Sequence, residues 1–474
     1  MTTLVRGAWV LTMEGVDGEG ALESAAVAFE DERITAVGSF EDLRAAHPDA
    51  EVVGDGNGIV MPGFVNAHTH LTEGLIPGMG ETASLWEWFE RVVNPVAKVL
   101  NREEVRVGTR LRGAEMLLGG ITTVNDMSCH RNLGALASLG AVDGLCELGL
   151  RGAVCFGAED DYPGAPDASV FMAEHEALAD RLAGEQRLAF RAGVGTVLGM
   201  TEVLLQRTVE ECRANNWSVH THLAEVREEM TASRARNGLT TIEHAAAIGL
   251  LDHDVIAGHC VWCSSHDISL LGAKQVAVAH NPVANMVLAS GVCPLERLKR
   301  EAITISLGTD GAASNDSQDM FGAVKAAALL QKVAALRADA ITAPEVLRMA
   351  TVEGARALGL QREVGSLEAG KRADVVLLDG DAVELATIHD PWQQIAYCAT
   401  PRCVSDVWID GEARVRAGEL VGHDVAELVA EARRFARELA TRAGLGAESV
   451  YAGAAPGGQR LAGFPFPTLA SPLG

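Results

Sequence analysis

The chain has 474 residues and a formal net charge of −25 at pH 7. Nucleic acids and anionic membranes both attract a basic protein face, so this charge argues against either partner and favours a small molecule. No apolar run has the length of a membrane span or a secretory signal, and the nine cysteines lack disulfide-framework spacing, so we expect a reduced, cytoplasmic protein.

The first 60 or so residues contain short apolar runs at residues 8–13 and 25–29. Their alternation is typical of β-strands, and a glycine-rich turn signal follows at residues 55–58. We therefore expect a small β unit at this end of the chain.

An apolar run at residues 63–70 ends in two histidines, His68 and His70, spaced one residue apart. In an extended strand such residues share a face, so both imidazoles can point at one metal ion. Taken alone, the pair also fits ordinary alternation on a half-buried strand.

Three later segments strengthen the metal interpretation. One apolar run ends at His222, with Glu225 three residues further on, a second closes on His259, and a third delivers Asp310. Each alone also fits a strand end, a hydrogen-bonded core residue or, for Glu225, a solvated glutamate that opens a helix. Four such segments in order are improbable by coincidence. We expect His220, which alternates with His222, to be a core or supporting residue.

Between about residues 61 and 365, β-rich runs alternate with stretches of helical spacing. The clearest helices are expected at residues 102–118, 203–215 and 320–335. This alternation predicts a parallel sheet with crossover helices, and at this length a closed eight-fold α/β barrel. Such barrels carry their working residues at the carboxyl ends of the strands, where every candidate above falls.

The remaining chain returns to strands and then forms a helix. Strands are expected at residues 375–379 and 404–411, and a capped amphipathic helix from about Asp424 to Arg442, packed on the barrel or on another subunit. The tail after Gly444 is rich in Gly, Ala and Pro, so it either binds a neighbouring subunit or is disordered.

Several long motifs resemble those of the amidohydrolase superfamily. The similarity is to the branch that holds adenosylhomocysteine and methylthioadenosine deaminases, guanine-type deaminases and the s-triazine hydrolases, and it covers nearly the whole chain. The motifs that carry it lie at residues 61–70, 222–225, 280–282, 308–316 and 365–374.

The resemblance implies a (β/α)8 TIM-type barrel with a composite β-sandwich built from both chain ends. It places the sandwich at residues 1–60 and 366–423, the catalytic barrel at residues 61–365, and a helix and tail at residues 424–474. Without it, the two β segments would be predicted as separate caps. Family members are commonly oligomers, so a homo-oligomer is expected.

In such a barrel one divalent metal would be held by His68, His70, His222 and Asp310. Three imidazoles and one carboxylate suit Zn²⁺, and Fe²⁺ also fits this ligand type. Binuclear relatives bridge two metals with a carboxylated lysine, but the chain has no lysine between Lys98 and Lys274. One metal is therefore expected, with a carboxylate-bridged pair as the alternative.

Three residues are the candidates for catalysis. Glu225 would take a proton from water and pass it to a ring nitrogen of the substrate, while Asp310 and His259 orient the nucleophile. A catalytic zinc site lowers the pKa of bound water to roughly 7, which provides hydroxide at neutral pH.

The expected substrate contacts rest on position alone. Trp88, Met127, His130 and Ser314 follow strand ends or the first histidine motif, and Trp86 or Trp88 could stack on a planar ring. Cys260 and Cys263 have zinc-knuckle spacing but no second pair, so we expect them to be structural.

The chain departs from the adenosyl deaminases that it resembles. It has Ala97 where they carry a ribose-binding glutamate, and no histidine within residues 192–200 where they carry one. We therefore expect a hydrolase that removes an amino or alkylamino group from a compact aromatic nitrogen heterocycle such as a purine, pyrimidine, pterin or triazine. The alternatives are dechlorination or other displacement on such a ring, adenosyl-type deamination, and a non-catalytic scaffold, which the complete ligand set disfavours.

Overall fold

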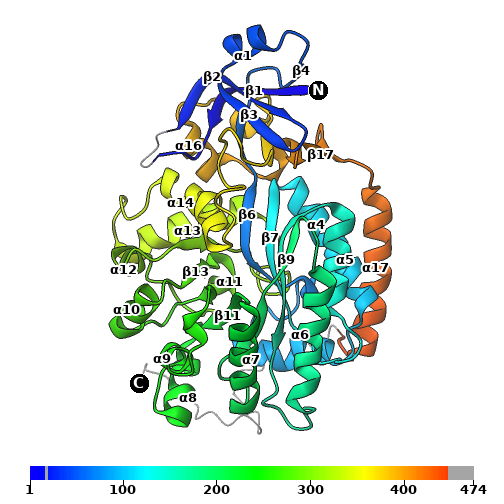
Figure 1. Cartoon of the computed structure of the whole chain (residues 1–474), viewed down its shortest axis with the longest axis vertical. Coiled ribbons are helices and arrows are strands. Elements are labelled where there is room, and N and C mark those ends of the chain that lie inside the picture. The colour runs from blue at the N-terminus through cyan, green and yellow to red at the C-terminus, as the bar shows by residue number, and fades with distance from the viewer. Residues whose placement is uncertain (16–19, 447–474) are drawn as a thin grey trace.

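A computed structural model describes residues 1–15 and 20–446 of the chain. Eight parallel strands form its centre, in the order β14-β13-β12-β11-β10-β8-β7-β6. The amide of Asp310, just after β14, donates to the carbonyl of His68 on β6 (2.9 Å), which brings the two ends of this sheet together. Helices surround the strands (Figure 1), so the predicted (β/α)8 barrel is confirmed.

The strands of the barrel are short and almost wholly buried, as expected for a parallel sheet covered by helices. They are β6 (Phe64–Thr69), β7 (Ile121–Ser128), β8 (Arg151–Ala158), β10 (Ala192–Thr196), β11 (Val219–Leu223), β12 (Val255–His259), β13 (Ala277–His280) and β14 (Ile305–Leu307), with β9 (Leu188–Phe190) paired to β8.

The helices that were predicted from periodicity are present. Residues 102–118 form α4, residues 202–215 form α7 and residues 320–335 form α13. A capping box between Asn101 and Glu104 fixes the start of α4. The α-helices in the described ranges are α1 (Phe40–Ala46), α2 (Leu85–Trp88), α3 (Asn94–Ala97), α4 (Arg102–Leu118), α5 (Ser138–Leu148), α6 (Ala168–Leu182), α7 (Glu202–Asn215), α8 (Arg227–Asn237), α9 (Thr241–Ala247), α10 (Ser265–Ala273), α11 (Pro282–Val287), α12 (Leu295–Arg300), α13 (Met320–Ala335), α14 (Ala343–Met349), α15 (Val352–Ala357), α16 (Pro391–Gln393) and α17 (Val425–Arg442).

Both chain ends contribute to one second sheet, which lies above the barrel in Figure 1. Its strands are β1 (Thr2–Leu11), β2 (Ala21–Glu30), β3 (Arg33–Ser39), β4 (Glu51–Val53), β5 (Ile59–Pro62), β15 (Val375–Leu378), β16 (Val404–Ile409), β17 (Glu412–Arg416) and β18 (Glu419–Leu420).

This sheet differs in one respect from the expected sandwich. Strand β5 pairs with both β1 and β15, so the two halves form one continuous hydrogen-bonded sheet. The rings of Phe29 and Trp408 nevertheless meet across its interior, 6.0 Å between centroids. A shared core therefore joins the two ends of the chain.

Helix α17 begins after its cap Asp424 and packs on the barrel helix α4, where Arg110 and Glu431 pair at 2.7 Å. Of its two predicted locations, the structure thus supports the barrel. The tail was predicted to bind a neighbouring subunit or to be disordered. Its residues from 447 onward lie outside the described part of the chain. Within the described part, no helix combines the length and apolarity that crossing a bilayer requires.

Candidate active site

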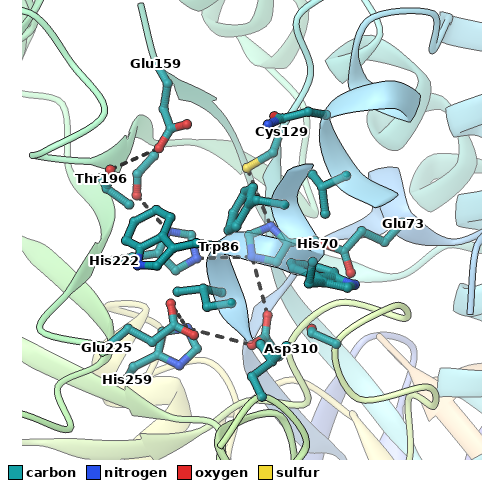
Figure 2. A pocket seen from close by; sticks show the side chains of 18 of the residues that line it. His70, Glu73, Trp86, Cys129, Glu159, Thr196, His222, Glu225, His259 and Asp310 are labelled. Carbon is teal, nitrogen blue, oxygen red and sulfur yellow. Dashed lines mark hydrogen bonds and ion pairs between the residues drawn. The ribbon is translucent and has the colours of Figure 1, made fainter. Parts of the chain in front are cut away.

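The predicted site residues meet at the carboxyl ends of the barrel strands (Figure 2). His68 lies on β6 and His70 directly follows that strand, His222 lies on β11, His259 is the last residue of β12, and Asp310 follows β14. His259 and Asp310 adopt left-handed backbone conformations, with φ of 69° and 68°. Such conformations are strained for residues other than glycine and gather at functional sites.

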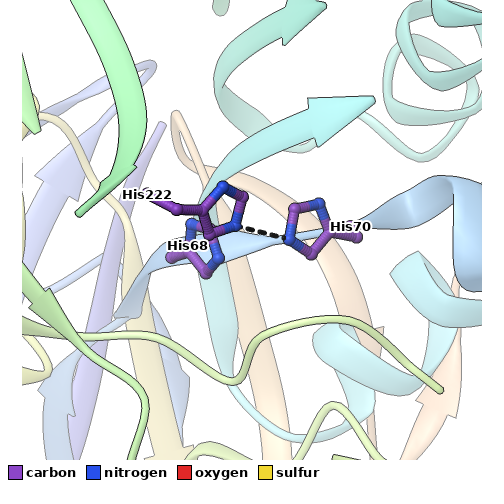
Figure 3. A group of neighbouring side chains, drawn as sticks. All are labelled: His68, His70 and His222. Carbon is purple, nitrogen blue, oxygen red and sulfur yellow. Dashed lines mark hydrogen bonds between the residues drawn. The ribbon is translucent and has the colours of Figure 1, made fainter. Parts of the chain in front are cut away.

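The nitrogens of three imidazoles converge on one point. One ring nitrogen each from His68, His70 and His222 lies within 4.8 Å of the others, and Figure 3 shows the three rings facing one another. Asp310 adds a carboxylate, with its Oδ1 3.3 Å from His68 Nε2 and 3.4 Å from His70 Nε2.

Hydrogen bonds fix the protonation of two of these rings. His70 Nδ1 donates to the Met127 carbonyl (2.7 Å) and His222 Nδ1 donates to the Gly195 carbonyl (2.6 Å). Burial lowers the pKa of both rings, so each is neutral and its Nε2 carries a lone pair. These two lone pairs face each other at 3.1 Å, an arrangement that a cation between them would stabilise. The donor set therefore fits a divalent metal.

His68 and Asp310 complete the cluster. Burial lowers the pKa of His68 to about 4, and its Nδ1 lies 2.8 Å from Nε2 of the buried His220. His220 thus supports His68 from behind. Burial alone would raise the pKa of Asp310, but the surrounding imidazoles hold it well below its ordinary value, so Asp310 is a carboxylate.

Glu225 and His259 lie beside the cluster. Their carboxylate and Nε2 are 3.7 Å apart, and His259 Nε2 is also 3.7 Å from Asp310. Burial raises the pKa of Glu225 to about 7, which suits a group that accepts and releases protons near neutrality. The carboxylate of Glu229 accepts the amides of Ala224 and Glu225 at 2.8 Å and so holds this turn in place.

A hollow of about 890 Å³, open mouth included, lies over this cluster. Trp86, Trp88 and Phe89 form an aromatic wall, and Ser314 also lines the hollow. Two predicted substrate contacts, Met127 and His130, are not among its lining residues.

The structure gives both of those residues other surroundings. Met127 is buried and offers His70 its carbonyl rather than its side chain. His130 turns away to pair with Glu174 on α6 at 3.1 Å. Cys260 and Cys263 are buried free thiols outside the cluster. The Cys263 thiol donates a hydrogen bond to the Cys260 carbonyl.

Several lining residues were not predicted from the sequence. They include Glu73, Arg131, Glu159 and Thr196. Glu159 directly follows β8 and Thr196 ends β10, so the rule that barrel strands deliver function at their carboxyl ends could have identified both. No comparable signal marks Arg131.

A barrel of this kind, with histidines and an aspartate at the carboxyl ends of its strands, is the architecture of a hydrolytic barrel enzyme. The model of the amidohydrolase family matches residues 59–414, and that of an imidazolonepropionase-like composite domain matches residues 25–50. The chain belongs to the amidohydrolase family, as its motifs predicted. It is an enzyme that hydrolyses carbon–nitrogen bonds.

Its relatives match it over almost their full length. A 5-methylthioadenosine/S-adenosylhomocysteine deaminase of Moorella thermoacetica is 34% identical over 90% of this chain and 97% of its own. The crystal structure of an adenosine deaminase from Xanthomonas campestris with bound zinc is 32% identical over 93% of this chain and 98% of its own, with a TM-score of 0.86. An atrazine chlorohydrolase from Arthrobacter aurescens, complexed with zinc, has a TM-score of 0.84 at 24% identity (92% and 100% covered), which shows the fold alone.

Proposed function

We propose that the protein is a metal-dependent aminohydrolase that removes an amino group from an aromatic nitrogen heterocycle. The observation that carries this proposal is the opposition of the His70 and His222 lone pairs at 3.1 Å, next to Asp310 and Glu225. His68, His70, His222 and Asp310 would hold a Zn²⁺ ion at this point. A divalent ion there would make water nucleophilic near neutral pH.

The other residues of the cluster would move protons and orient the reactants. Glu225 takes a proton at its carboxylate and delivers it to a ring nitrogen, so that the ring carbon accepts the nucleophile. His259, which donates from Nδ1 to Asn285 (2.8 Å), presents Nε2 toward Asp310 and Glu225 and holds the nucleophile in line. The tetrahedral intermediate then collapses: its hydroxyl gives up a proton, which Glu225 passes to the departing amino group, the carbon–nitrogen bond breaks, and a carbonyl and ammonia are formed.

Two features of the hollow support a flat aromatic substrate. Trp86, Trp88 and Phe89 offer aromatic rings for stacking, while polar side chains such as Glu225 and Asp310 also line the hollow and can orient a ring. The named relatives are deaminases of adenosine compounds, which puts 6-aminopurines ahead of pyrimidines, pterins and triazines as substrates. Ala97 is buried and does not line the hollow, so sugar binding, if it occurs, relies on other residues.

The test is ammonia release from a panel of 6-aminopurines, aminopyrimidines, pterins and aminotriazines, before and after chelation. We expect turnover of at least one class that disappears on chelation and returns with Zn²⁺. Chloride release from a chlorotriazine in the same panel would identify the alternative leaving group. The proposal would be refuted by turnover that chelation does not reduce, or by an Asp310→Ala variant that keeps full activity and bound zinc.

A further inference from the structure

Glu159 is a carboxylate in the hollow to which the proposed chemistry assigns no role. It follows β8, and its side chain is 24% exposed toward the hollow that it lines. Figure 2 shows it beyond Thr196 and His222, across the view from Glu225, His259 and Asp310. Strands β8, β10 and β11 are neighbours, so the backbones of Glu159 and His222 lie about two strand spacings apart, roughly 10 Å, with Gly195 of β10 between their side chains.

The surrounding backbone is shaped to hold this side chain. A Cβ at Gly195 would lie 2.6 Å from Glu159 Cγ, and a Cβ at Gly199 would lie 2.5 Å from its Oε1. Thr196 donates its hydroxyl to Glu159 Oε1 at 3.0 Å and accepts the Gly199 amide at 2.8 Å. Two glycines and a threonine thus form a slot that fixes one carboxylate oxygen and leaves room for the side chain.

The second oxygen has a weaker partner. Glu159 Oε2 lies 4.0 Å from Arg131 Nη2, too far for a hydrogen bond, and the Arg131 guanidinium also stacks 4.4 Å above the Tyr162 ring. Burial raises the pKa of Glu159, while Arg131 opposes that rise. A half-buried carboxylate whose second oxygen lacks a close hydrogen-bond donor gains free energy from a donor that a ligand supplies.

We propose that Glu159 determines substrate specificity by accepting hydrogen bonds from a donor-bearing substituent, a hydroxyl or an ammonium group, at the end of the substrate remote from the reacting amino group. The inference rests on the proposed deamination. A ring at the metal cluster bridges much of the distance to Glu159, so a substituent on the ring's far side meets the carboxylate. An apolar substituent would displace water from the carboxylate and leave its Oε2 without a close hydrogen-bond donor.

The experiment compares kcat/KM for ammonia release within two matched substrate pairs. One pair is adenosine and 2′,3′,5′-trideoxyadenosine, and the other is 9-(3-aminopropyl)adenine and 9-propyladenine. We expect the zinc-loaded wild type to prefer the donor-bearing member of at least one pair by about 10- to 100-fold, the range for a hydrogen bond to a charged group. The first pair reports hydroxyl recognition and the second ammonium recognition.

Variants then assign the preference to Glu159. Glu159→Ala should bring the ratio close to one, whereas Glu159→Gln, which keeps a carbonyl acceptor but no charge, should retain part of a hydroxyl preference and lose an ammonium preference. The matched control is Asp161→Asn, two residues away, whose exposed side chain pairs with Arg236 outside the hollow and which should keep the ratio. Thermal unfolding and zinc content verify that each variant is folded and loaded.

The possible failures are distinguishable. If the wild type releases ammonia but shows no preference in either pair, the proposed role of Glu159 is overturned and the proposed deamination still stands. This measurement needs no variant. A preference that survives Glu159→Ala in folded enzyme overturns it as well. No ammonia from any of the four adenines, with zinc bound, overturns deamination of 6-aminopurines and this inference with it.

Discussion

The backbone carbonyls of Met127 and Gly195 control the chemistry of the cluster at the scale of single residues. By accepting Nδ1–H from His70 and His222, they direct both Nε2 lone pairs into one space. The tautomer of each ring is thus set by the partner of its other nitrogen. Glu225 is not among the converging ligands, and burial raises the pKa of its carboxyl to about 7.

The first prediction concerns Glu225→Gln. The amide keeps the size of the side chain but cannot carry a proton between water and ring, so we expect kcat to fall about 10²- to 10⁴-fold. Zinc content should stay unchanged, because Glu225 is not among the converging ligand atoms. Steady-state ammonia assays and elemental analysis measure the two quantities. Glu228→Gln, on the exposed start of α8, serves as the control and should keep wild-type rates.

At the scale of elements, Arg151 joins the barrel to the sheet from the chain ends. It lies on β8, and its guanidinium forms a bidentate ion pair with Asp374, in which both hydrogen bonds measure 3.1 Å. It also pairs with Asp410. Asp374 precedes β15 and Asp410 follows β16, so one side chain ties two elements of the second sheet to the barrel. The three side chains are less than 10% exposed.

We predict that Arg151→Gln lowers the free energy of unfolding by about 3 kcal/mol, because it leaves Asp374 buried without its cation and removes one of the cations beside Asp410, which keeps Arg187. Burial would raise the pKa of Asp410, but Arg151 and Arg187 hold it below its ordinary value. The stabilisation is therefore present above the unfolded pKa of about 3.9 and is lost as pH falls through the lower folded pKa. Denaturant titrations from pH 7 to pH 3 should show the difference from wild type shrink only below about pH 4. A difference independent of pH throughout would argue against this ion network.

At the scale of the whole molecule, the proposed metal links segments that are far apart in the chain. Its ligand atoms come from the end of β6, from β11 and from Asp310 after β14, so they span the chain from residue 68 to residue 310. A ligand that binds only the folded state stabilises it by about 4 kcal/mol when present at a thousand times its Kd.

Removal of the metal should accordingly lower the melting temperature by about 5 °C or more, and added Zn²⁺ should restore it. Differential scanning calorimetry of chelated and reloaded protein measures the shift. Asp310→Ala provides the comparison, since its melting temperature should respond weakly to Zn²⁺. Equal melting temperatures for loaded and chelated wild type would count against these ligands.

The sequence by itself determined the barrel, the positions of α4, α7 and α13, and the strand ends that carry His68, His70, His222, His259 and Asp310. Periodicity reports these features because burial repeats every second residue in a strand and every three to four in a helix. Parallel strands place their carboxyl ends at one edge, so residues that close such runs meet without further information.

Only the tertiary structure decided which loop residues enter the hollow. His130 and Glu159 both follow strands, yet His130 pairs with Glu174 on α6 while Glu159 fills a slot next to Gly195. Loops have no period, and a side chain beyond a strand end takes the direction in which a partner and free space exist. Those partners come from other strands and helices, so local sequence does not encode the choice.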